Sequence, residues 1–494
     1  MLRKIRIILA VLFFTGITLL LVGIGREWWG WMAKLQFLPS CLALNFAVIA
    51  GVLLLTLAFG RIYCSVICPM GVFQDIVMWI RREGGLQLNK IKTRKLKKLK
   101  AQGETDLPKF KPYVKHFSYV KENRWARYGV LALTVAAIIA GLQVFVALIA
   151  PYSAYGRIVS SIFGVASGRS VAPVMLIVAG VTLVLIFICA WFWGRAWCNT
   201  ICPVGTFLGL FSRFALFRPV FDVAKCNACG RCYRGCKSSC IDGDHHCIDY
   251  SRCVVCFDCL RRCKQGAIHY EFVGFKGPRI NAGDAPKPEP QAESVDKGRR
   301  AFMATTAVLA TGIAAEAQNK HLDGGLAPVI AKTPVKRSER LVPFGALSVK
   351  DFYDRCTACQ LCVDNCPNGV LRPSTDLEHL LQPQMGYENG WCRPECTACS
   401  QVCPAGAIKP ISREEKATMK IGTAKVNAVS CIGCGNCVRH CPSGALRMVK
   451  DNEGKQVVTV AEEQCIGCGA CEYLCPVRPV SAIIVNGIST HQSK

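Results

Sequence analysis

Six tight runs of cysteine are the residues of this sequence best suited to chemistry. Three thiolates on one tight loop can bind three irons of a [4Fe–4S] cubane, and a fourth, at a helix start, binds the neighbouring cluster. Five runs follow the spacing Cys-x2-Cys-x2-Cys-x3-Cys, and the run beginning at Cys392 has one extra residue in its first gap. The runs therefore predict six [4Fe–4S] clusters, in pairs. They are Cys226, Cys229, Cys232 and Cys236; Cys253, Cys256, Cys259 and Cys263; Cys356, Cys359, Cys362 and Cys366; Cys392, Cys396, Cys399 and Cys403; Cys431, Cys434, Cys437 and Cys441; and Cys465, Cys468, Cys471 and Cys475.

Zinc and disulfides are the alternative interpretations of a chain with 32 cysteines. Zinc takes four ligands in two pairs, so a third cysteine at this spacing is not required as a zinc ligand. Disulfides between neighbouring thiols of such a loop would close strained rings. The spacing favours iron–sulfur clusters over both.

Cross-ligation predicts the ligands of the two N-terminal clusters. Lys237 and Lys264 stand where proline follows the last cysteine of each C-terminal run. Between the N-terminal runs, Cys240 and Cys247 flank two histidines and read either as a loop insertion or as an extra metal site. The predicted ligand sets are Cys226, Cys229 and Cys232 with Cys263, and Cys253, Cys256 and Cys259 with Cys236.

A second motif, Cys-x3-Cys-Pro, occurs twice within a longer internal repeat. Gly60–Phe73 holds Cys64 and Cys68, and Gly194–Phe207 holds Cys198 and Cys202. The four thiolates could bind a seventh cluster shared between two hairpins, form disulfides or redox-active thiol pairs on an oxidising side, or mark a turn with a conformational or docking role. Cys41 and Cys189, inside apolar stretches, read as small core residues.

Four uncharged apolar stretches are each long enough to cross a hydrocarbon core of about 30 Å as a helix. The basic residues lie before the first stretch and between the second and third, which places those segments, and the chain after the fourth stretch, in the cytoplasm. The basic segment sets orientation or docks to anionic lipid. The stretches are Ile7–Gly25, Leu35–Gly60, Tyr128–Ala150 and Ser170–Gly194. Because the charge of +27 lies beside them, nucleic acid is not an expected partner.

The segment after the four apolar stretches carries a pattern that predicts an internal export signal. Arg299 and Arg300 precede a weakly apolar run, 301–315, and a small Ala-x-Ala site ending at Ala317. This pattern is typical of a twin-arginine signal, which exports folded, cluster-loaded proteins. A short linker helix is the alternative, and the run is either cleaved at Ala317 or kept as a fifth span.

The expected fold is a membrane α-helical part with four spans, or five with the last run, plus α+β bacterial-ferredoxin-like [4Fe–4S] domains. The chain has no Cys-x2-Cys-His, no GxGxxG and no Walker A sequence, and no histidine in the four stretches. Haem, flavin and nucleotide are therefore not expected, and the sequence predicts an electron carrier. The expected domains are 1–215 (membrane), 216–276 (two clusters), 277–298 (linker), 299–317 (signal) and 318–494 (four clusters).

These motifs carry a resemblance to two families. Residues 1–275, with the spans, both Cys-x3-Cys-Pro repeats and a two-cluster segment, resemble NapH/MauN-type membrane ferredoxins. Residues 297–494, with Arg299, Arg300 and Phe302 before four cysteine runs, resemble NapG/MauM-type exported ferredoxins. The whole chain resembles a natural fusion of the two.

The resemblance implies a quinol dehydrogenase component, an oxidoreductase of the bacterial inner (cytoplasmic) membrane. Its substrate would be quinol and its acceptor a periplasmic redox protein, either a cytochrome c or a molybdoenzyme reductase. The first ferredoxin domain would be cytoplasmic, and the twin-arginine translocase would carry the C-terminal domain to the periplasm. The methylamine relatives imply an alternative, an accessory protein that reduces or assembles a partner enzyme without quinol turnover.

By the same resemblance, the C-terminal runs should pair first with fourth and second with third. The quinol site is indicated only by Arg26 and Glu27, beside three tryptophans that an interfacial aromatic belt also explains. The implied ligand sets are Cys356, Cys359 and Cys362 with Cys475; Cys465, Cys468 and Cys471 with Cys366; Cys392, Cys396 and Cys399 with Cys441; and Cys431, Cys434 and Cys437 with Cys403.

Overall fold

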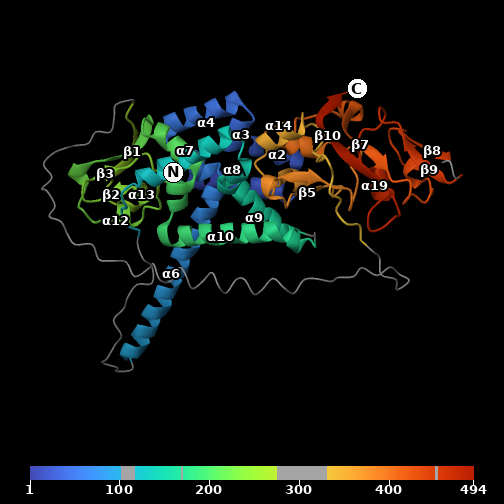
Figure 1. The fold of residues 1–494 in the computed structure, drawn as a ribbon. Coiled ribbons are helices and arrows are strands. Elements are labelled where there is room, and N and C mark those ends of the chain that lie inside the picture. The colour runs from blue at the N-terminus through green and yellow to red at the C-terminus, as the bar shows by residue number, and fades with distance from the viewer. Residues whose placement is uncertain (102–116, 169–170, 275–330, 451–453, 494) are drawn as a thin grey trace.

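The computed structural model describes residues 1–101, 117–168, 171–274, 331–450 and 454–493. A helical part, residues 1–216, lies between two cysteine-rich units (Figure 1). We call residues 217–274 the first cysteine unit and residues 331–493 the C-terminal unit. The predicted linker and export signal, 277–317, lie outside the described residues.

The helical part is built from short and long helices whose starts follow local sequence signals. Pro151, Pro173 and Pro203 each occupy the first turn of a helix, where a missing backbone N–H is not needed. The elements are α1 (Leu2–Leu21), α2 (Arg26–Lys34), α3 (Phe37–Leu42), α4 (Phe46–Phe59), α5 (Tyr63–Val66), α6 (Pro69–Ala101), α7 (Arg124–Ile139), α8 (Gln143–Ile149), α9 (Pro151–Ala166), α10 (Pro173–Trp193), the π-helical turn η1 (Trp197–Ile201) and α11 (Pro203–Ser212).

Two helices of the described chain, α1 and α10, are long and apolar enough to cross a membrane, and the α8–α9 pair, bent by 76°, would make a third. Four continuous spans are therefore not confirmed. The stretch expected at Leu35–Gly60 is divided at Leu44, which takes a left-handed φ of 54°, and the stretch at Tyr128–Ala150 is divided at Gly141, with a φ of 75°. Hydropathy alone could not reveal these breaks, because both sides of each break are apolar.

The two Cys-x3-Cys-Pro repeats face each other through a reciprocal pair of arginines. Arg61 Nη2 donates a hydrogen bond to the Cys198 carbonyl at 3.2 Å, and Arg195 Nη1 donates to the Cys64 carbonyl at 2.7 Å. Both arginines are fully buried. The internal repeat of the sequence is therefore a structural pseudo-symmetry, with each hairpin bonded to the cysteine turn of the other.

The first cysteine unit consists of two antiparallel strand pairs and two short helices. Its elements are β1 (Phe217–Phe221) paired with β4 (Ile268–Phe272), β2 (Ile241–Asp242) paired with β3 (Cys247–Ile248), the 3-10 turn η2 (Val223–Lys225), and the helices α12 (Arg231–Arg234) and α13 (Asp258–Arg262). The two short helices pack on each other, and each contains the third cysteine of its run, Cys232 in α12 and Cys259 in α13.

The C-terminal unit repeats this plan on a larger scale. Its helices are α14 (Val349–Arg355), α15 (Leu361–Asp364), η4 (Leu377–His379), α16 (Ala398–Val402), α17 (Arg413–Thr418), α18 (Asn436–Arg439) and α19 (Ala470–Leu474). Its strand pairs are β5 (Leu371–Pro373) with β6 (Pro383–Met385), β7 (Met419–Val426) with β10 (Ile483–Ser493), and β8 (Leu446–Lys450) with β9 (Gln456–Val460), all antiparallel. Helix α15 packs on α16, and α18 packs on α19.

The two cysteine-rich units contact opposite ends of α1. Near its start, Arg3 Nε lies 2.6 Å from Asp258 Oδ1 of the first cysteine unit. Near its end, the Leu20 carbonyl accepts a hydrogen bond from Asn365 Nδ2 of the C-terminal unit at 3.1 Å. A helix of this length spans about 30 Å, so the units are separated by roughly the thickness of a hydrocarbon core.

The close packing between the two cysteine turns can be tested by replacing a glycine that lies between them. A Cβ added at Gly71 would lie 2.1 Å from the Cys64 carbonyl oxygen and 2.9 Å from Arg195 Nη1. Gly71→Ala should therefore destabilise the folded protein by about 1–3 kcal/mol, since backbone must shift to make room. Gly84→Ala, on the same helix with nothing within 4 Å, should be neutral or stabilising. Thermal unfolding in detergent measures both, and equal stabilities of the two variants would contradict the packing.

Candidate iron–sulfur centres

Five of the six cysteine runs share one backbone conformation. In each of these runs the residues directly before and directly after the second cysteine have a positive φ, which turns successive backbone N–H groups toward one concave side of the loop. Such a nest of N–H groups binds anions, including iron–sulfur clusters. The residues are Ala228 and Gly230, Val255 and Phe257, Ala358 and Gln360, Gly433 and Gly435, and Gly467 and Gly469. Within residues 392–399, all described, no residue has a positive φ, which the extra residue in that gap explains.

In the first cysteine unit, the structure brings Cys236 to the second run. Burial raises the pKa of Cys259, and the neighbouring thiols of Cys256, Cys253 and Cys236 raise it further. A small cavity is lined by the same four cysteines. This is the set that cross-ligation requires. For the first run, Cys232 has Cys226 and Cys229 as neighbours, and the role of Cys263 there stays a prediction.

The insertion between the two runs places one of its two cysteines beside this site and the other at the surface. Cys240 is buried with its Sγ 3.5 Å from Cys236 Sγ, whereas Cys247 is exposed. His245 bonds to Asp242, and His246 packs edge-on against Phe221. The insertion therefore adds one thiol beside the predicted cluster and does not gather its histidines and cysteines at one point.

The expected pairing of the C-terminal runs is wrong at the first run. Burial raises the pKa of Cys356, Cys359 and Cys362, and the Cys403 thiol is a neighbour that raises each of them. Cys475, the expected partner, is not there. The first and second runs are joined because α15 and α16 pack on each other, which carries the last cysteine of one run to the other.

The other three sites follow the same rule of neighbouring runs. Cys399 has Cys392, Cys396 and Cys366 as neighbours. The electrostatic neighbours of Cys468 and Cys471 define a third set, Cys465, Cys468 and Cys471 with Cys441. A cavity of about 20 Å³ is lined by the fourth set, Cys431, Cys434 and Cys437 with Cys475. The observed order is therefore first with second and third with fourth, in place of the expected first with fourth and second with third.

The two pairs of sites in the C-terminal unit meet at Cys392 and Cys468. The Cys392 N–H donates to the Cys468 carbonyl at 3.0 Å. Tyr387 is fully buried beside them and donates its hydroxyl to the Gly467 carbonyl at 2.6 Å. The four sites thus form a row that begins at Cys359 and ends at Cys434, which is exposed.

The row begins against the helical part. A Cβ added at Gly156 of α9 would lie 2.3 Å from the Cys359 carbonyl oxygen. Tyr152, also on α9, has Cys359 and Cys403 as electrostatic neighbours. The first thiol site of the C-terminal unit is therefore in direct contact with the bent helix pair.

The four cysteines of the Cys-x3-Cys-Pro repeats come together in the helical part. Cys64 and Cys198 are neighbours of the Cys68 thiol, and Cys202 has all three others as neighbours. All four are buried and free. We call them the shared thiol site, because each hairpin supplies two of its members.

Basic and polar groups surround the shared thiol site. Arg61 Nη2 lies 3.8 Å from Cys64 Sγ, and Gln74 Nε2 lies 3.3 Å from Cys198 Sγ. Arg195 is held by Asp75 through an ion pair of 2.9 Å. Buried thiolates need such partners, because an uncompensated charge in an apolar interior is costly. The donor set fits a [4Fe–4S] cluster, whose four thiolates and core carry net negative charge.

No three His, Cys, Asp or Glu side chains of the described residues lie close enough together to hold a single metal ion. The thiol groups nevertheless suit a cubane. In a cubane each thiolate binds a different iron, so the four thiolate sulfurs lie further from one another than the sulfurs that bind a single zinc. Each zinc–sulfur bond is only about 2.3 Å long.

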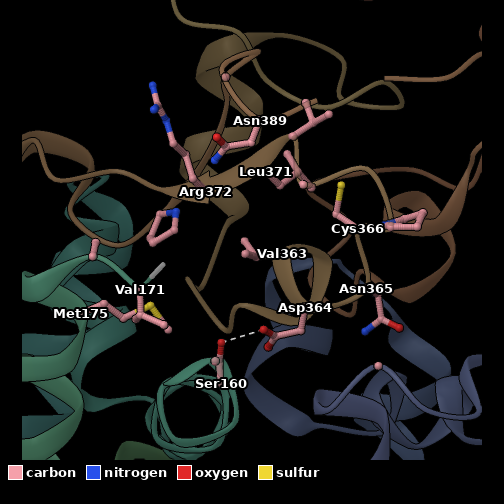
Figure 2. Close-up of a pocket in the computed structure, with 18 of the residues that line it drawn as sticks. Ser160, Val171, Met175, Val363, Asp364, Asn365, Cys366, Leu371, Arg372 and Asn389 are labelled. Carbon is pink, nitrogen blue, oxygen red and sulfur yellow. Dashed lines mark hydrogen bonds between the residues drawn. The ribbon is translucent and has the colours of Figure 1, made fainter. Parts of the chain in front are cut away.

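Arg26 and Glu27, the predicted quinol residues, begin α2 and line a large pocket. Its volume is about 1280 Å³, and its other walls include the start of α10 and the segment around Cys366. Figure 2 shows Cys366 and Asp364 beside this cavity, with Ser160 of α9 bonded to Asp364. Sequence reasoning found one wall of the pocket and missed the other, because the facing residues lie more than 300 positions away.

Family comparisons agree with the class of protein that these sites define. A 4Fe-4S binding domain family matches residues 43–86 and 171–222, the two segments that hold the shared thiol site. A second 4Fe-4S binding domain matches residues 349–372, and 4Fe-4S dicluster domains match 391–446 and 430–478. The chain therefore carries several ferredoxin-type 4Fe-4S domains together with membrane-type helices, as an iron–sulfur electron-transfer protein does.

Individual relatives narrow this class. The chain is 30% identical over 196 residues to the methylamine utilization ferredoxin-type protein MauN of Paracoccus denitrificans, covering 39% of this chain and 54% of that protein. It is 25% identical over 203 residues to the ferredoxin-type protein NapH of Haemophilus influenzae (41% and 55%). It is 31% identical over 123 residues to the methylamine utilization ferredoxin-type protein MauM of Methylobacillus flagellatus (23% and 52%). The chain thus spans about half the length of the curated relatives it matches.

The shared thiol site predicts a specific change in iron content. Cys202→Ser should remove about four iron and four sulfide per chain, because a cubane that loses one thiolate from a buried site is not retained. Cys189→Ser, on α10 and in none of the thiol groups, is the matched control and should keep all its iron. Iron and acid-labile sulfide analysis of both purified variants measures this. Equal contents would contradict a cluster at this site.

The buried side chain of Lys416 should raise the reduction potential of the cluster predicted at Cys392. Lys416 Nζ donates to Cys392 Sγ at 3.2 Å and to the Cys396 carbonyl at 2.6 Å. Lys416→Met should lower that cluster's reduction potential by on the order of 100 mV, because a cation about 5 Å away stabilises the more negative reduced state at an effective dielectric of about 20. Lys425→Met, exposed on β7, should leave it unchanged. EPR-monitored redox titration is the measurement, and an unaltered potential in Lys416→Met would contradict the proposed electrostatic effect.

Proposed function

We propose that this chain oxidises quinol of a bacterial inner membrane and passes the electrons through [4Fe–4S] clusters to a periplasmic redox protein. The observation that carries the proposal is the row of thiol sites in the C-terminal unit. Its first member contacts α9, and its last reaches the surface at Cys434. A membrane electron donor at one end and a protein acceptor at the other would both be within reach of a cluster.

The proposal includes six clusters in the paired runs and a seventh at the shared thiol site. Their ligands are the sets assembled above, with Cys263 completing the first N-terminal site. Support comes from the N–H nests, from the burial of part of the thiols and from the matches to 4Fe-4S domains.

The same proposal treats the chain as a NapH/MauN-like membrane part joined to a NapG/MauM-like part. Similarity to both MauN and MauM supports the fusion. The four-span topology, the domain boundaries and the twin-arginine export of residues 318–494 belong to this proposal. The separation of the two units along α1 is what such a topology requires.

An accessory function in assembling or reducing a partner enzyme is the second candidate. The names of the methylamine utilization relatives are the observation that favours it. It requires clusters but no quinol turnover, which makes the two candidates separable.

Anaerobic reduction of the detergent-purified protein tests the proposed function. Menaquinol should bleach the visible iron–sulfur absorbance, and added menaquinone should restore it, because quinol oxidation is reversible at the clusters. Dithionite serves as the control for intact clusters. Bleaching by dithionite but not by menaquinol would contradict quinol oxidation and favour the accessory function.

A further inference from the structure

The large pocket beside Cys366 lies at the junction of the helical part and the C-terminal unit. One wall comes from the end of α1 at Val22, the start of α2 and the start of α10 at Ala172. The opposite wall comes from the C-terminal unit, including Val363 and Cys366. The pocket is therefore at the level where α1 ends and α10 begins, which is one end of both candidate spans.

The lining of the pocket combines apolar residues with many polar and charged side chains, among them Lys332, Arg372 and Glu388. Val171, Met175 and Val363 face the cavity in Figure 2. Ser160 Oγ donates to Asp364 Oδ1 at 2.8 Å, which fixes this carboxylate at the wall. Glu27 is exposed at the rim. An apolar patch beside fixed polar groups that can orient a ligand is typical of small-molecule sites.

One wall of the pocket is also a predicted cluster ligand. Cys366 lines the cavity and is a neighbour of Cys399, in the second thiol site of the C-terminal unit. A molecule in the pocket would thus contact a residue bonded to an electron acceptor.

We infer that this pocket binds the quinol ring, and the inference rests on the proposed function. A lipid-soluble occupant is favoured because the pocket adjoins span ends, and its volume of about 1280 Å³ exceeds what a ring alone requires. The Asp364 carboxylate is placed to accept a hydrogen bond from a quinol hydroxyl. Arg26 and Glu27 form the polar rim.

Oxidation of the quinol in the pocket conserves both electrons and protons. The quinol loses two electrons and two protons and becomes quinone. The electrons would pass one at a time to oxidised [4Fe–4S] clusters, the oxidant of this step, and the cluster that Cys366 would help to hold is the first within reach. The protons pass to water at the rim by way of the exposed Glu27 carboxylate.

Filling the pocket tests the inference. Ala172 lines the pocket, whereas Leu176, one turn further along α10, is exposed and does not. On the opposite wall, Thr375 lines the pocket and Leu377 is exposed outside it. Ala172→Trp and Thr375→Trp are therefore blocking variants, with Leu176→Trp and Leu377→Trp as matched controls. Two blocking variants on different walls protect the test against the misfolding of one of them.

Two readouts on the full detergent-purified protein separate binding from turnover. The first is fluorescence titration with the quinol analogue heptyl-hydroxyquinoline N-oxide, which does not need electron transfer. The second is the initial rate of cluster bleaching by menaquinol. Both blocking variants should bind the analogue and react with menaquinol at least about tenfold more weakly than wild type, with controls unchanged. Iron content and reduction by dithionite should be equal in all proteins.

The possible results distinguish the inference from the function on which it rests. Menaquinol bleaching of wild type that persists unchanged in both blocking variants would overturn the pocket and leave quinol oxidation standing. No bleaching of wild type, with analogue binding that the blocking variants lose, would overturn quinol oxidation while supporting the pocket as a quinone-binding site. Neither bleaching nor analogue binding by wild type would overturn both.

Discussion

A cubane cluster takes four thiolates, and a tight loop of this spacing can supply only three of them. Every cysteine run must therefore meet a second segment, and this requirement organises the described structure. It explains why α15 packs on α16 and α18 on α19, since each pair exchanges the last cysteine of its run. The same requirement acts in the helical part, where each hairpin contributes two thiols to the shared thiol site. Short helices and two-stranded sheets suffice for the cysteine-rich units, because cluster ligation replaces much of the hydrophobic core that units of this size would otherwise need.

Negative charge is the second consequence of gathering thiolates in a buried place. Backbone N–H nests at five of the six runs, and buried cations at the other thiol sites, compensate this negative charge. Arg61 and Arg195 lie at the shared thiol site, and Lys416 lies at Cys392. Lys237 links the first cysteine unit to the helical part by ion pairs to Asp258 and Asp75, at 3.2 and 3.5 Å. Part of the large positive charge of this sequence thus serves thiol sites directly, in addition to the orientation that the sequence alone indicated.

Sequence reasoning was most informative where chemistry depends on local spacing. The runs predicted the loops whose N–H groups now face one side, and the repeated Cys-x3-Cys-Pro motif suggested a site that the reciprocal arginines assemble. It failed where the outcome depends on tertiary packing. The pairing of the C-terminal runs was wrong because nothing in the spacing says which run is adjacent, and the broken spans were missed because Leu44 and Gly141 interrupt helices without interrupting hydropathy. Glu27 was found, but the facing wall at Asp364 and Cys366 depends on contacts between distant segments.

The position of Lys416 bears on why quinol would react at this end of the molecule. Burial of a cluster lowers its reduction potential, because the reduced state carries more charge into a medium that solvates it poorly. A nearby cation opposes this and makes the cluster a better electron acceptor. Lys416 contacts Cys392, whose site includes Cys366 at the pocket wall, so the cation and the pocket belong to the same cluster. Quinol is a weaker reductant than the donors of ordinary low-potential ferredoxins, and it therefore requires an acceptor tuned in this direction. The first site of the row, at Cys359, contacts α9 and also has a buried cation nearby, because Arg157 of α9 is fully buried and has the Cys359 thiol as an electrostatic neighbour. Buried cations therefore lie at both sites that the first two runs form, and both sites are favoured as electron acceptors by the same electrostatic effect.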